Sequence, residues 1–591
     1  MCLRFFVSLC YRFPRSNSSP RYSKSLATKC SVQNGRNSSG NKDVVRQHFH
    51  PSVWKDHDFV PSSICNSNLK AERVGEGRLE QLKKEVKNIF FISRNNPTKE
   101  LELIDKMQQL GVAYHFEAEI QDRLQAIYND NHISEDCTDL YVVALRFRLL
   151  REAGYYVSSD VFEKFRDTEG GFHSSIASDI KAMLSLYEAS LLSFIGEDIL
   201  DEATTFTRKH LSSMVTHQSS QLASEIERTL NAPLQKRVDR VHAKYYISIY
   251  EQEKSWNKNL LEFAKLDYNA VQLLHQKSIS EAQWWWDSIN IKSKLPFDIR
   301  DRVVEAYAVV MNINPEPQFS LGTIHLTKLW CILSVLDDAF DVHGVLDELE
   351  PLCDALQRWD AEGAKGLTEH MKVIFDEVLN LFNEIESDMM RKGHLIGIPY
   401  FKKHIQSHAK NLFEEAKILF SKDLPTLEEW LSIATLTAGI HPFIVVAVMN
   451  LEEQAKKDVF DWILSMPDFI INSSLLVRLL GDIASFKVER ERGINVSIVP
   501  LYMKKNGVSE SEAIDSLRKK ITTTWKVVNQ EYMGEKHVPL QVRKIIMNFN
   551  RTIALFYTDE DGHTVSNGRT KEIITSLLID PIPTLDNAKN N

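Results

Sequence analysis

Helix-breaking residues are scarce in this 591-residue chain, which contains only 22 Gly and 18 Pro. Long stretches therefore run without the residues that most often form turns. Sets of alternating strands and repeats of fixed period are also missing, whereas residues 179–200 and 372–389 carry apolar side chains three and four positions apart. The sequence predicts an all-α protein that is long enough for more than one hydrophobic core.

Cysteine is also scarce, and the seven residues lie scattered without a CxxC pair. This spacing argues against a disulfide framework and against a zinc–thiolate site, and it favours a reducing compartment. No uninterrupted apolar run approaches the ~20 residues needed to cross a bilayer. We therefore expect no membrane span.

Acidic residues are missing from the first 42 residues, which hold eight Arg or Lys and nine Ser. This composition is typical of an organelle transit peptide, and the alternative is an N-terminal tail that is never removed. Cleavage would lower the net charge from −9 to −17. A body this acidic is a poor nucleic-acid binder, so we expect no nucleic-acid partner.

Three acids, Asp337, Asp338 and Asp341, follow the apolar run 329–336 directly. On an α-helix, Asp337 and Asp341 share one face, and burying two carboxylates there is costly without a cation between them. Mg²⁺ prefers oxygen ligands of this kind and usually shares them with substrate phosphates. The alternative is a solvated acidic turn at a helix end.

A second polar stripe lies in residues 476–489. If this segment is helical, Arg478, Gly481, Ser485 and Glu489 fall on one face. A hydroxyl and a carboxylate four residues apart could hold one Mg²⁺, with the arginine on a phosphate oxygen. Taken alone, Ser485 would be interpreted as an ordinary surface residue of a helix.

Two arginines, Arg300 and Arg302, follow Pro296 and Phe297 where a helix is expected to begin. Their guanidinium groups could bind phosphate oxygens in fork geometry. Ion pairs with the neighbouring acids 298, 301 and 305 are the alternative.

Together, this order of motifs resembles that of plant class I terpene synthases. The resemblance covers roughly residues 46–583 and is supported by residues 49–54, 186–190, 196–198, 260–277, 358–360 and 557–562. It implies a two-domain terpene synthase fold. Residues 43–265 would form a relic N-terminal α-barrel without chemistry of its own, residues 266–591 the catalytic class I helical bundle, and residues 1–42 a plastid transit peptide. Cytoplasmic localisation is the alternative if the N-terminus is not a transit peptide.

The resemblance also implies a mechanism, in which Mg²⁺ triggers departure of diphosphate from a prenyl diphosphate. Three Mg²⁺ ions are expected, with Mn²⁺ as a substitute, in a monomeric enzyme. The metal ligands carried over are Asp337, Asp338, Asp341, Ser485 and Glu489. Arg300, Arg302 and Arg478 would hold the leaving group, and Tyr557 and Asp561 would lie near the pocket mouth as lid and proton acceptor.

Three departures from the family pattern stand out. Gly481 replaces the Asn or Asp that supplies the first ligand of the third metal, so we expect a higher Mg²⁺ requirement. Val309 replaces a cavity-lining tryptophan, which leaves room for a longer chain unless Tyr307 or Trp330 moves inward. Val44 and Val45 stand where C10-using relatives carry tandem arginines.

The roomier cavity at Val309, the absence of tandem arginines and the transit-like N-terminus favour a C20 or C25 substrate. The alternative is C15 farnesyl diphosphate, because the motif style resembles that of C15 enzymes. The N-terminal half lacks the DxDD of class II cyclases, and a chain-elongating prenyltransferase would need a second DDxxD. A helical scaffold that has lost catalysis is the non-enzymatic alternative.

Overall fold

The computed structural model describes residues 49, 51–55, 57–59, 69–130, 137–360, 362–421, 423–491, 496–558 and 560–584. Within these ranges the chain is helical, and the one β feature is an isolated bridge between Arg166 and Phe172. This confirms the all-α prediction for the described part of the chain. The predicted transit peptide, residues 1–42, and Val44 and Val45 lie outside the described residues.

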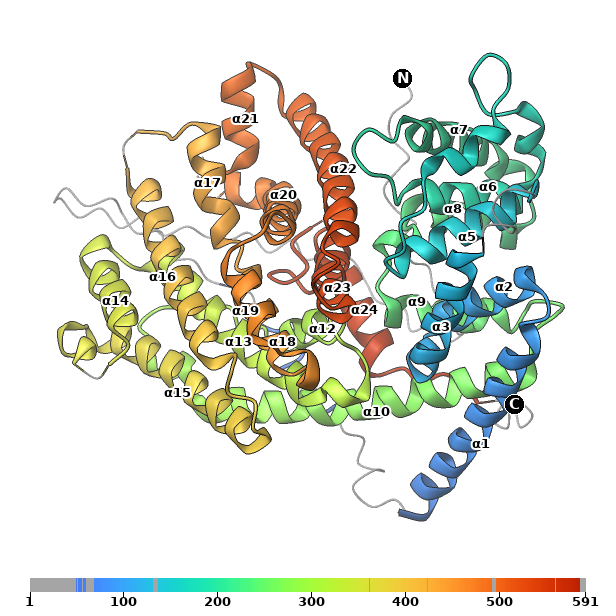
Figure 1. The fold of residues 1–591 in the computed structure, drawn as a ribbon. Coiled ribbons are helices and arrows are strands. Elements are labelled where there is room, and N and C mark those ends of the chain that lie inside the picture. The colour runs from blue at the N-terminus through green and yellow to red at the C-terminus, as the bar shows by residue number, and fades with distance from the viewer. Residues whose placement is uncertain are drawn as a thin grey trace, which may run out of the picture.

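The N-terminal domain contains eight described α-helices before residue 251, drawn in blue to green at one side of Figure 1. They are α1 (Leu69–Ser93), α2 (Pro97–Gln109), α3 (Glu117–Asn129), α5 (Leu140–Glu152), α6 (Ile180–Ser190), α7 (Asp198–Met214), α8 (Ser220–Asn231) and α9 (Asp239–Tyr250). The periodic segment 179–200 is therefore two helices. The chain turns between them at Gly196, whose φ of 87° is open to glycine without strain.

The C-terminal domain is a bundle of helices, drawn in yellow-green to red in Figure 1. They are α11 (Ile291–Lys294), α12 (Val303–Val310), α13 (Ser320–Asp338), α14 (Leu346–Arg358), α15 (Glu369–Lys392), α16 (Ile398–Phe420), α17 (Leu427–Thr437), α18 (Ile440–Met449), α19 (Lys457–Leu464), α20 (Asp468–Glu491), α21 (Ile498–Asn506), α22 (Glu510–Gly534), α23 (Leu540–Phe556) and α24 (Arg569–Leu578). The predicted helical segment 372–389 lies inside α15.

The helix α10 (Lys258–Ile289) runs beneath both domains in Figure 1. Its first part, including Phe263 and Tyr268, packs into the N-terminal core, whereas Ile279 and Trp286 pack into the core of the bundle. The domain junction predicted near residue 265 therefore falls inside one continuous helix. Because α10 contributes to both cores, it fixes the position of the two domains relative to each other.

Among the residues that the structure describes, three helical segments are long and apolar enough to cross a membrane by length and composition alone: Pro317–His343, Leu427–Met449 and Asp468–Glu491. The search for uninterrupted apolar runs missed them, because polar residues interrupt each one. The most apolar windows of the first two are 72% buried inside the protein, and that of the third is 44% buried. Packing within the bundle therefore accounts for most of the apolar side chains of the first two.

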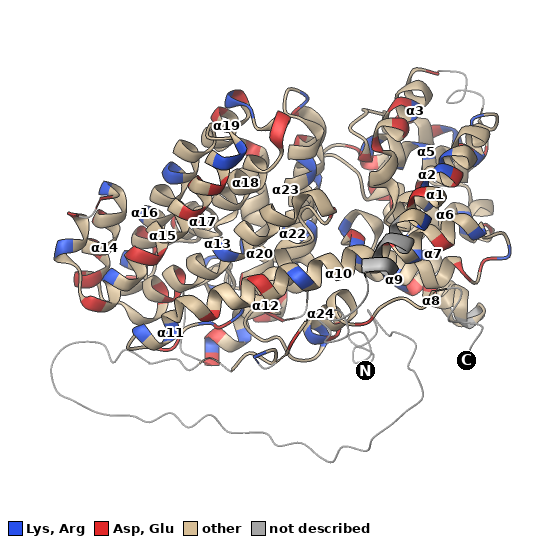
Figure 2. Cartoon of the chain, turned by 90° about the horizontal axis from the view of Figure 1, so that it is seen from below, with Lys and Arg blue, Asp and Glu red and all other residues tan. Residues whose placement is uncertain are grey.

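Charged residues of both signs are mixed along the helices. Figure 2 shows Lys and Arg interspersed with Asp and Glu on the described helices of both domains. Each domain therefore presents a mixed surface where the structure describes it, in line with a modest net charge of −9 for the whole chain.

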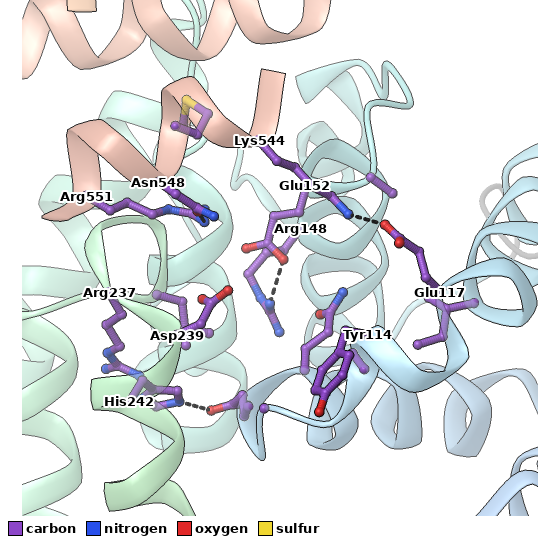
Figure 3. A pocket seen from close by; sticks show the side chains of 18 of the residues that line it. Tyr114, Glu117, Arg148, Glu152, Arg237, Asp239, His242, Lys544, Asn548 and Arg551 are labelled. Atoms are coloured by element: carbon purple, nitrogen blue, oxygen red, sulfur yellow. Dashed lines mark hydrogen bonds and ion pairs between the residues drawn. The ribbon is translucent and has the colours of Figure 1, made fainter. Parts of the chain in front are cut away.

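A cavity of about 250 Å³ lies between the two domains, lined by residues of α2, α3, α5, α9 and α23. Figure 3 shows its charged side chains. Arg148 pairs with Asp105 and Glu152, and Lys544 on α23 reaches Glu117 on α3 at 2.8 Å. Ion pairs within the N-terminal domain and an ion pair between the domains therefore line this space.

Candidate active site

The DDxxD residues lie where the regular α-helix of α13 ends. Asp337 and Asp338 belong to its last turn, and Asp341 lies in the π-helical turn η7 (Ala339–His343). The Gly344 amide donates to the Ala339 carbonyl at 2.8 Å, five residues back, which widens the turn. The prediction of an α-helical i, i+4 pair is therefore wrong in its geometry, and such π turns are frequent at functional sites.

Arg300 binds the first two of these acids. Its side chain donates to Asp337 Oδ2 at 2.5 Å and to Asp338 Oδ1 at 2.7 Å, and its backbone amide donates to Asp338 Oδ2 at 2.9 Å. Both carboxylate oxygens of Asp338, which is 1% exposed, are thus occupied. In this structure Asp338 positions Arg300, and its role as a metal ligand stays a prediction.

Asp341 has a different environment. Water reaches its side chain, but the surrounding protein and the nearby Asp337 and Glu415 carboxylates raise its pKa well above the ordinary value. Arg478 and Arg300 oppose this shift without cancelling it. A carboxylate in such an excess of negative charge is stabilised by an added cation.

The α20 stripe forms as its spacing predicts. Ser485 Oγ lies 2.6 Å from Glu489 Oε1 and 3.0 Å from the Gly481 carbonyl oxygen, both within hydrogen-bond reach. The other carboxylate oxygen of Glu489, Oε2, is buried without a hydrogen-bond partner. Burial, and next the Asp482 carboxylate, raise the pKa of Glu489 to about 7. A buried acceptor without a partner costs free energy that a bound cation would offset.

Gly481 leaves the expected third-metal ligand position without a side chain. A Cβ atom built there would meet no atom within 4 Å outside the local helix backbone. The neighbouring Asp482 cannot fill the role, because it accepts hydrogen bonds from Arg478 at 3.4 Å and from the Ile498 amide at 3.0 Å. The position is therefore open in space and lacks a protein ligand.

Arg478 anchors α20 to the break between α17 and α18. It donates to the Ala434 carbonyl and to Thr437 Oγ1, both at 2.9 Å. Glu415 on α16 lies 3.8 Å away and is 3% exposed. Burial lowers the pKa of Arg478, but nearby carboxylates outweigh this effect and raise the pKa above its ordinary value. These carboxylates belong to Glu415, Asp482, Asp341 and Asp337. Arg478 on α20 therefore lies near the DDxxD acids Asp337 and Asp341. Sequence analysis missed Glu415, since no motif marks it.

Arg302 contacts the C-terminal loop rather than the DDxxD acids. Its guanidinium donates to the Thr564 carbonyl at 2.9 and 3.2 Å. Asp561 Oδ1 accepts from the amides of His563 and Thr564 at 3.1 and 3.0 Å, which folds the loop. Burial and Asp561 raise the pKa of Tyr557 well above its ordinary value. The Arg300 charge opposes this rise in the pKa of Tyr557, so Arg300 also lies near the loop. Four predicted site residues therefore lie close together at the C-terminal loop: Arg300, Arg302, Tyr557 and Asp561.

Val309 is buried, and the two proposed substitutes for its missing indole differ. Tyr307 is fully buried and turned to His275 on α10, whose Nδ1 lies 2.8 Å from the phenol oxygen. Trp330 instead packs in an aromatic group with Phe443, Phe549 and His563. Tyr307 therefore does not compensate for Val309.

The described residues contain no group of three or more His, Cys, Asp or Glu side chains arranged to hold a metal ion. The oxygens predicted to bind metal occur instead as pairs, Asp337 with Asp341 and Ser485 with Glu489. This donor set fits Mg²⁺, which takes one or two carboxylates and completes its shell with substrate phosphates and water. The unpartnered Glu489 Oε2 and the raised pKa values of Asp341 and Glu489 point to the same fit.

Comparison with known proteins gives matches over nearly the whole chain. A family model described as "Terpene synthase, N-terminal domain" matches residues 53–230, and one described as "Terpene synthase family, metal binding domain" matches residues 287–527. The (−)-germacrene D synthase of Vitis vinifera is 38% identical over 537 residues, which cover 91% of this chain and 95% of that protein. Sesquiterpene synthase 2 of Toona sinensis is 38% identical over 541 residues, covering 91% and 96%.

Among solved structures, the isoprene synthase of Populus x canescens superposes with a TM-score of 0.79 at 33% identity, covering 86% of this chain and 98% of that chain. That structure contains three Mg²⁺ ions and dimethylallyl-S-thiolodiphosphate.

Proposed function

The chain belongs to the terpene synthase family, lyases that act on prenyl diphosphates, and from this premise we propose that it converts farnesyl diphosphate to a sesquiterpene with release of diphosphate. Relatives that are named sesquiterpene synthases and are covered over nearly their whole length support the C15 substrate. They favour it over the C20 or C25 substrate that the N-terminus and Val309 suggest. A catalytically inactive scaffold is the weaker reading, since the acids and arginines of both motifs are present.

The observation that carries the proposal is the approach of two oxygen-rich faces to one arginine. Arg478 on α20 is close enough to Asp341 and Asp337 for their charges to raise its pKa. Ser485 and Glu489 lie on the same helix as Arg478. A diphosphate between the two faces would meet carboxylate-held cations on both sides and a guanidinium between them.

Each residue has a proposed part in the reaction. Asp337 and Asp341 bind Mg²⁺ on one side, and Ser485 and Glu489 bind it on the other. Bound Mg²⁺, three ions by family analogy with Mn²⁺ as a substitute, supplies Lewis-acid stabilisation of the leaving group. Arg300 and Arg478 stabilise the negative charge that develops on the diphosphate oxygens. Asp338 positions Arg300, and Arg302 holds the loop that excludes water.

The test is turnover of the full chain with Mg²⁺ and each of the C10, C15, C20 and C25 diphosphates, with products identified by gas chromatography and mass spectrometry. We expect hydrocarbon or alcohol products of 15 carbons, formed with the highest kcat/KM. Turnover of C20 or C25 alone would contradict the proposal.

Localisation and assembly are further parts of the proposal. Residues 1–42 have the composition of a plastid transit peptide, whereas a C15 substrate favours the cytoplasmic alternative. Fluorescent fusions of the full chain and of residues 43–591 in plant cells distinguish the two. A monomer is expected in solution, and size-exclusion chromatography with light scattering measures it.

A further inference from the structure

Trp330 donates a hydrogen bond from its indole N–H to His563 Nε2 at 2.8 Å. Trp330 belongs to α13, whereas His563 belongs to the loop that follows α23, so a tertiary contact brings them together. His563 is 2% exposed, and Trp330 is only partly buried. The indole therefore covers the imidazole on the side from which its Nε2 lone pair would be reached.

This pair lies on the metal-binding side of α13. Trp330 precedes Asp337 by seven residues, nearly two full turns, so both side chains leave the helix on the same face. Phe443 and Phe549 complete the aromatic group, with ring centroids 5.0 and 6.3 Å from that of Trp330. A prenyl chain that extends from a diphosphate at Asp337 along this face would pass over Trp330.

The C-terminal loop holds His563 firmly in place. Asp561 accepts from the His563 amide at 3.1 Å, and Arg302 donates to the carbonyl of the next residue, Thr564. Gly562 has no room for a side chain, because a Cβ atom there would lie 2.6 Å from the Phe556 carbonyl oxygen. The backbone on either side of His563 therefore has little freedom to carry the imidazole away from the indole.

The hydrogen bond also fixes the chemical state of His563. An indole N–H can only donate, so Nε2 must carry a lone pair and the imidazole proton sits on Nδ1. Burial, and next the Arg300 and Arg302 charges, lower the pKa of His563 well below its ordinary value, so it stays neutral. A carbocation is acidic enough to give a proton even to a weakly basic imidazole beside its path, provided that the Nε2 lone pair is accessible.

We propose that Trp330 masks the Nε2 lone pair of His563 and thereby prevents early deprotonation of the carbocation, which makes this pair a determinant of product specificity. The proposal rests on the proposed terpene synthase reaction. With the lone pair unmasked, Nε2 would take a proton from a carbon next to the cationic centre. The electron pair of the broken C–H bond would become a new C=C bond, the cation would be neutralised, and His563 would become imidazolium.

The experiment compares product ratios of four full-length variants with the wild type: Trp330→Phe, His563→Phe, the double variant and Trp462→Phe. In Trp330→Phe we expect the share of alkenes from early deprotonation to rise about fivefold, the ratio that corresponds to a hydrogen bond of ~1 kcal/mol. In His563→Phe the ratios stay near wild type, because the imidazole is already masked. The double variant returns to the His563→Phe pattern.

Trp462→Phe is the matched control, because it removes an indole whose N–H has no hydrogen-bond partner. It should leave the product ratios unchanged. If the double variant keeps the Trp330→Phe pattern, the lost indole volume explains the change and masking is wrong. An unchanged product pattern in Trp330→Phe overturns it as well. Failure of the wild type to convert farnesyl diphosphate would instead refute the proposed function, so the two failures are distinguishable.

Discussion

The protein has two charged interiors, and they balance their charges differently. In the cavity between the domains, Arg148 pairs with Asp105 and Glu152. At the C-terminal end of α13 and along α20, carboxylates outnumber the arginines that face them. The pKa of Asp341 is raised well above its ordinary value. The first region is largely neutralised by its own side chains, whereas the second has an excess of negative charge that suits bound cations.

This difference teaches that the size of a cavity does not by itself identify an active site. The cavity of about 250 Å³ in Figure 3 is lined by both domains, but its charged side chains pair with one another where the domains meet. The unpartnered oxygen of Glu489 and the exposed carboxylate of Asp341 are the stronger signals, and they lie in the proposed catalytic region. Unbalanced charge near a recognised motif is the stronger signal.

The sharpest contrast between the regions is catalytic. Asp337→Asn removes a metal-binding charge and should lower kcat roughly 1000-fold, equivalent to ~4 kcal/mol of transition-state stabilisation. Asp239→Asn in the interdomain cavity is the matched control and should leave kcat within a factor of two or so of wild type. Steady-state kinetics with farnesyl diphosphate measures both. Equal losses of kcat in Asp337→Asn and Asp239→Asn would show that the two regions do not differ in catalysis.

The interdomain cavity should instead determine stability. The Arg148 side chain is 6% exposed and pairs with two carboxylates, so Arg148→Met removes the ion-pair partner of both and should destabilise the fold by about 3 kcal/mol. Lys544→Met breaks a pair whose side chains are 34% and 54% exposed, and should cost below ~1 kcal/mol. Urea unfolding measures both. A larger loss of stability in Lys544→Met than in Arg148→Met would contradict the conclusion that the buried Arg148 pairs stabilise the fold.

Restoring the missing ligand should strengthen the metal-binding region. Gly481→Asn adds a side-chain oxygen in open space, and should lower the Mg²⁺ concentration for half-maximal rate about tenfold, or ~1.4 kcal/mol. Gly481→Ala, which adds bulk without a ligand, is the control. An identical Mg²⁺ requirement in the Asn variant and the wild type would show that position 481 does not face the third metal.

Glu316 is the exception in the interdomain cavity, because its Oε2 atom is buried without a hydrogen-bond partner. Burial is the main cause that raises its pKa to about 7. The folded state therefore holds this proton more tightly than the unfolded state, and the resulting stability is lost as pH rises through 7. Glu316→Gln should stabilise the protein by about 1 kcal/mol at pH 8 and by little at pH 5. Melting curves at both pH values test this, and a gain at pH 5 alone would reverse the sign.

Local spacing predicted the helical class and the polar stripe of α20, because a helix places residues three and four apart on one face. It could not predict the π turn at Ala339–His343 or the break at Gly196, which depend on particular backbone hydrogen bonds and dihedral angles. Local spacing also could not predict contacts between distant segments. The binding of Asp338 by Arg300 and the pairing of Trp330 with His563 arise only when the bundle is assembled.

The most direct test of the central claim is anomalous diffraction from crystals of the full chain soaked with Mn²⁺ and pyrophosphate. We predict peaks about 2.1 Å from carboxylate oxygens of Asp337 and Asp341 and from Glu489, with pyrophosphate between them and near Arg478. Absence of any peak beside Asp341, or a peak only in the interdomain cavity near Asp105 and Glu152, would contradict the account.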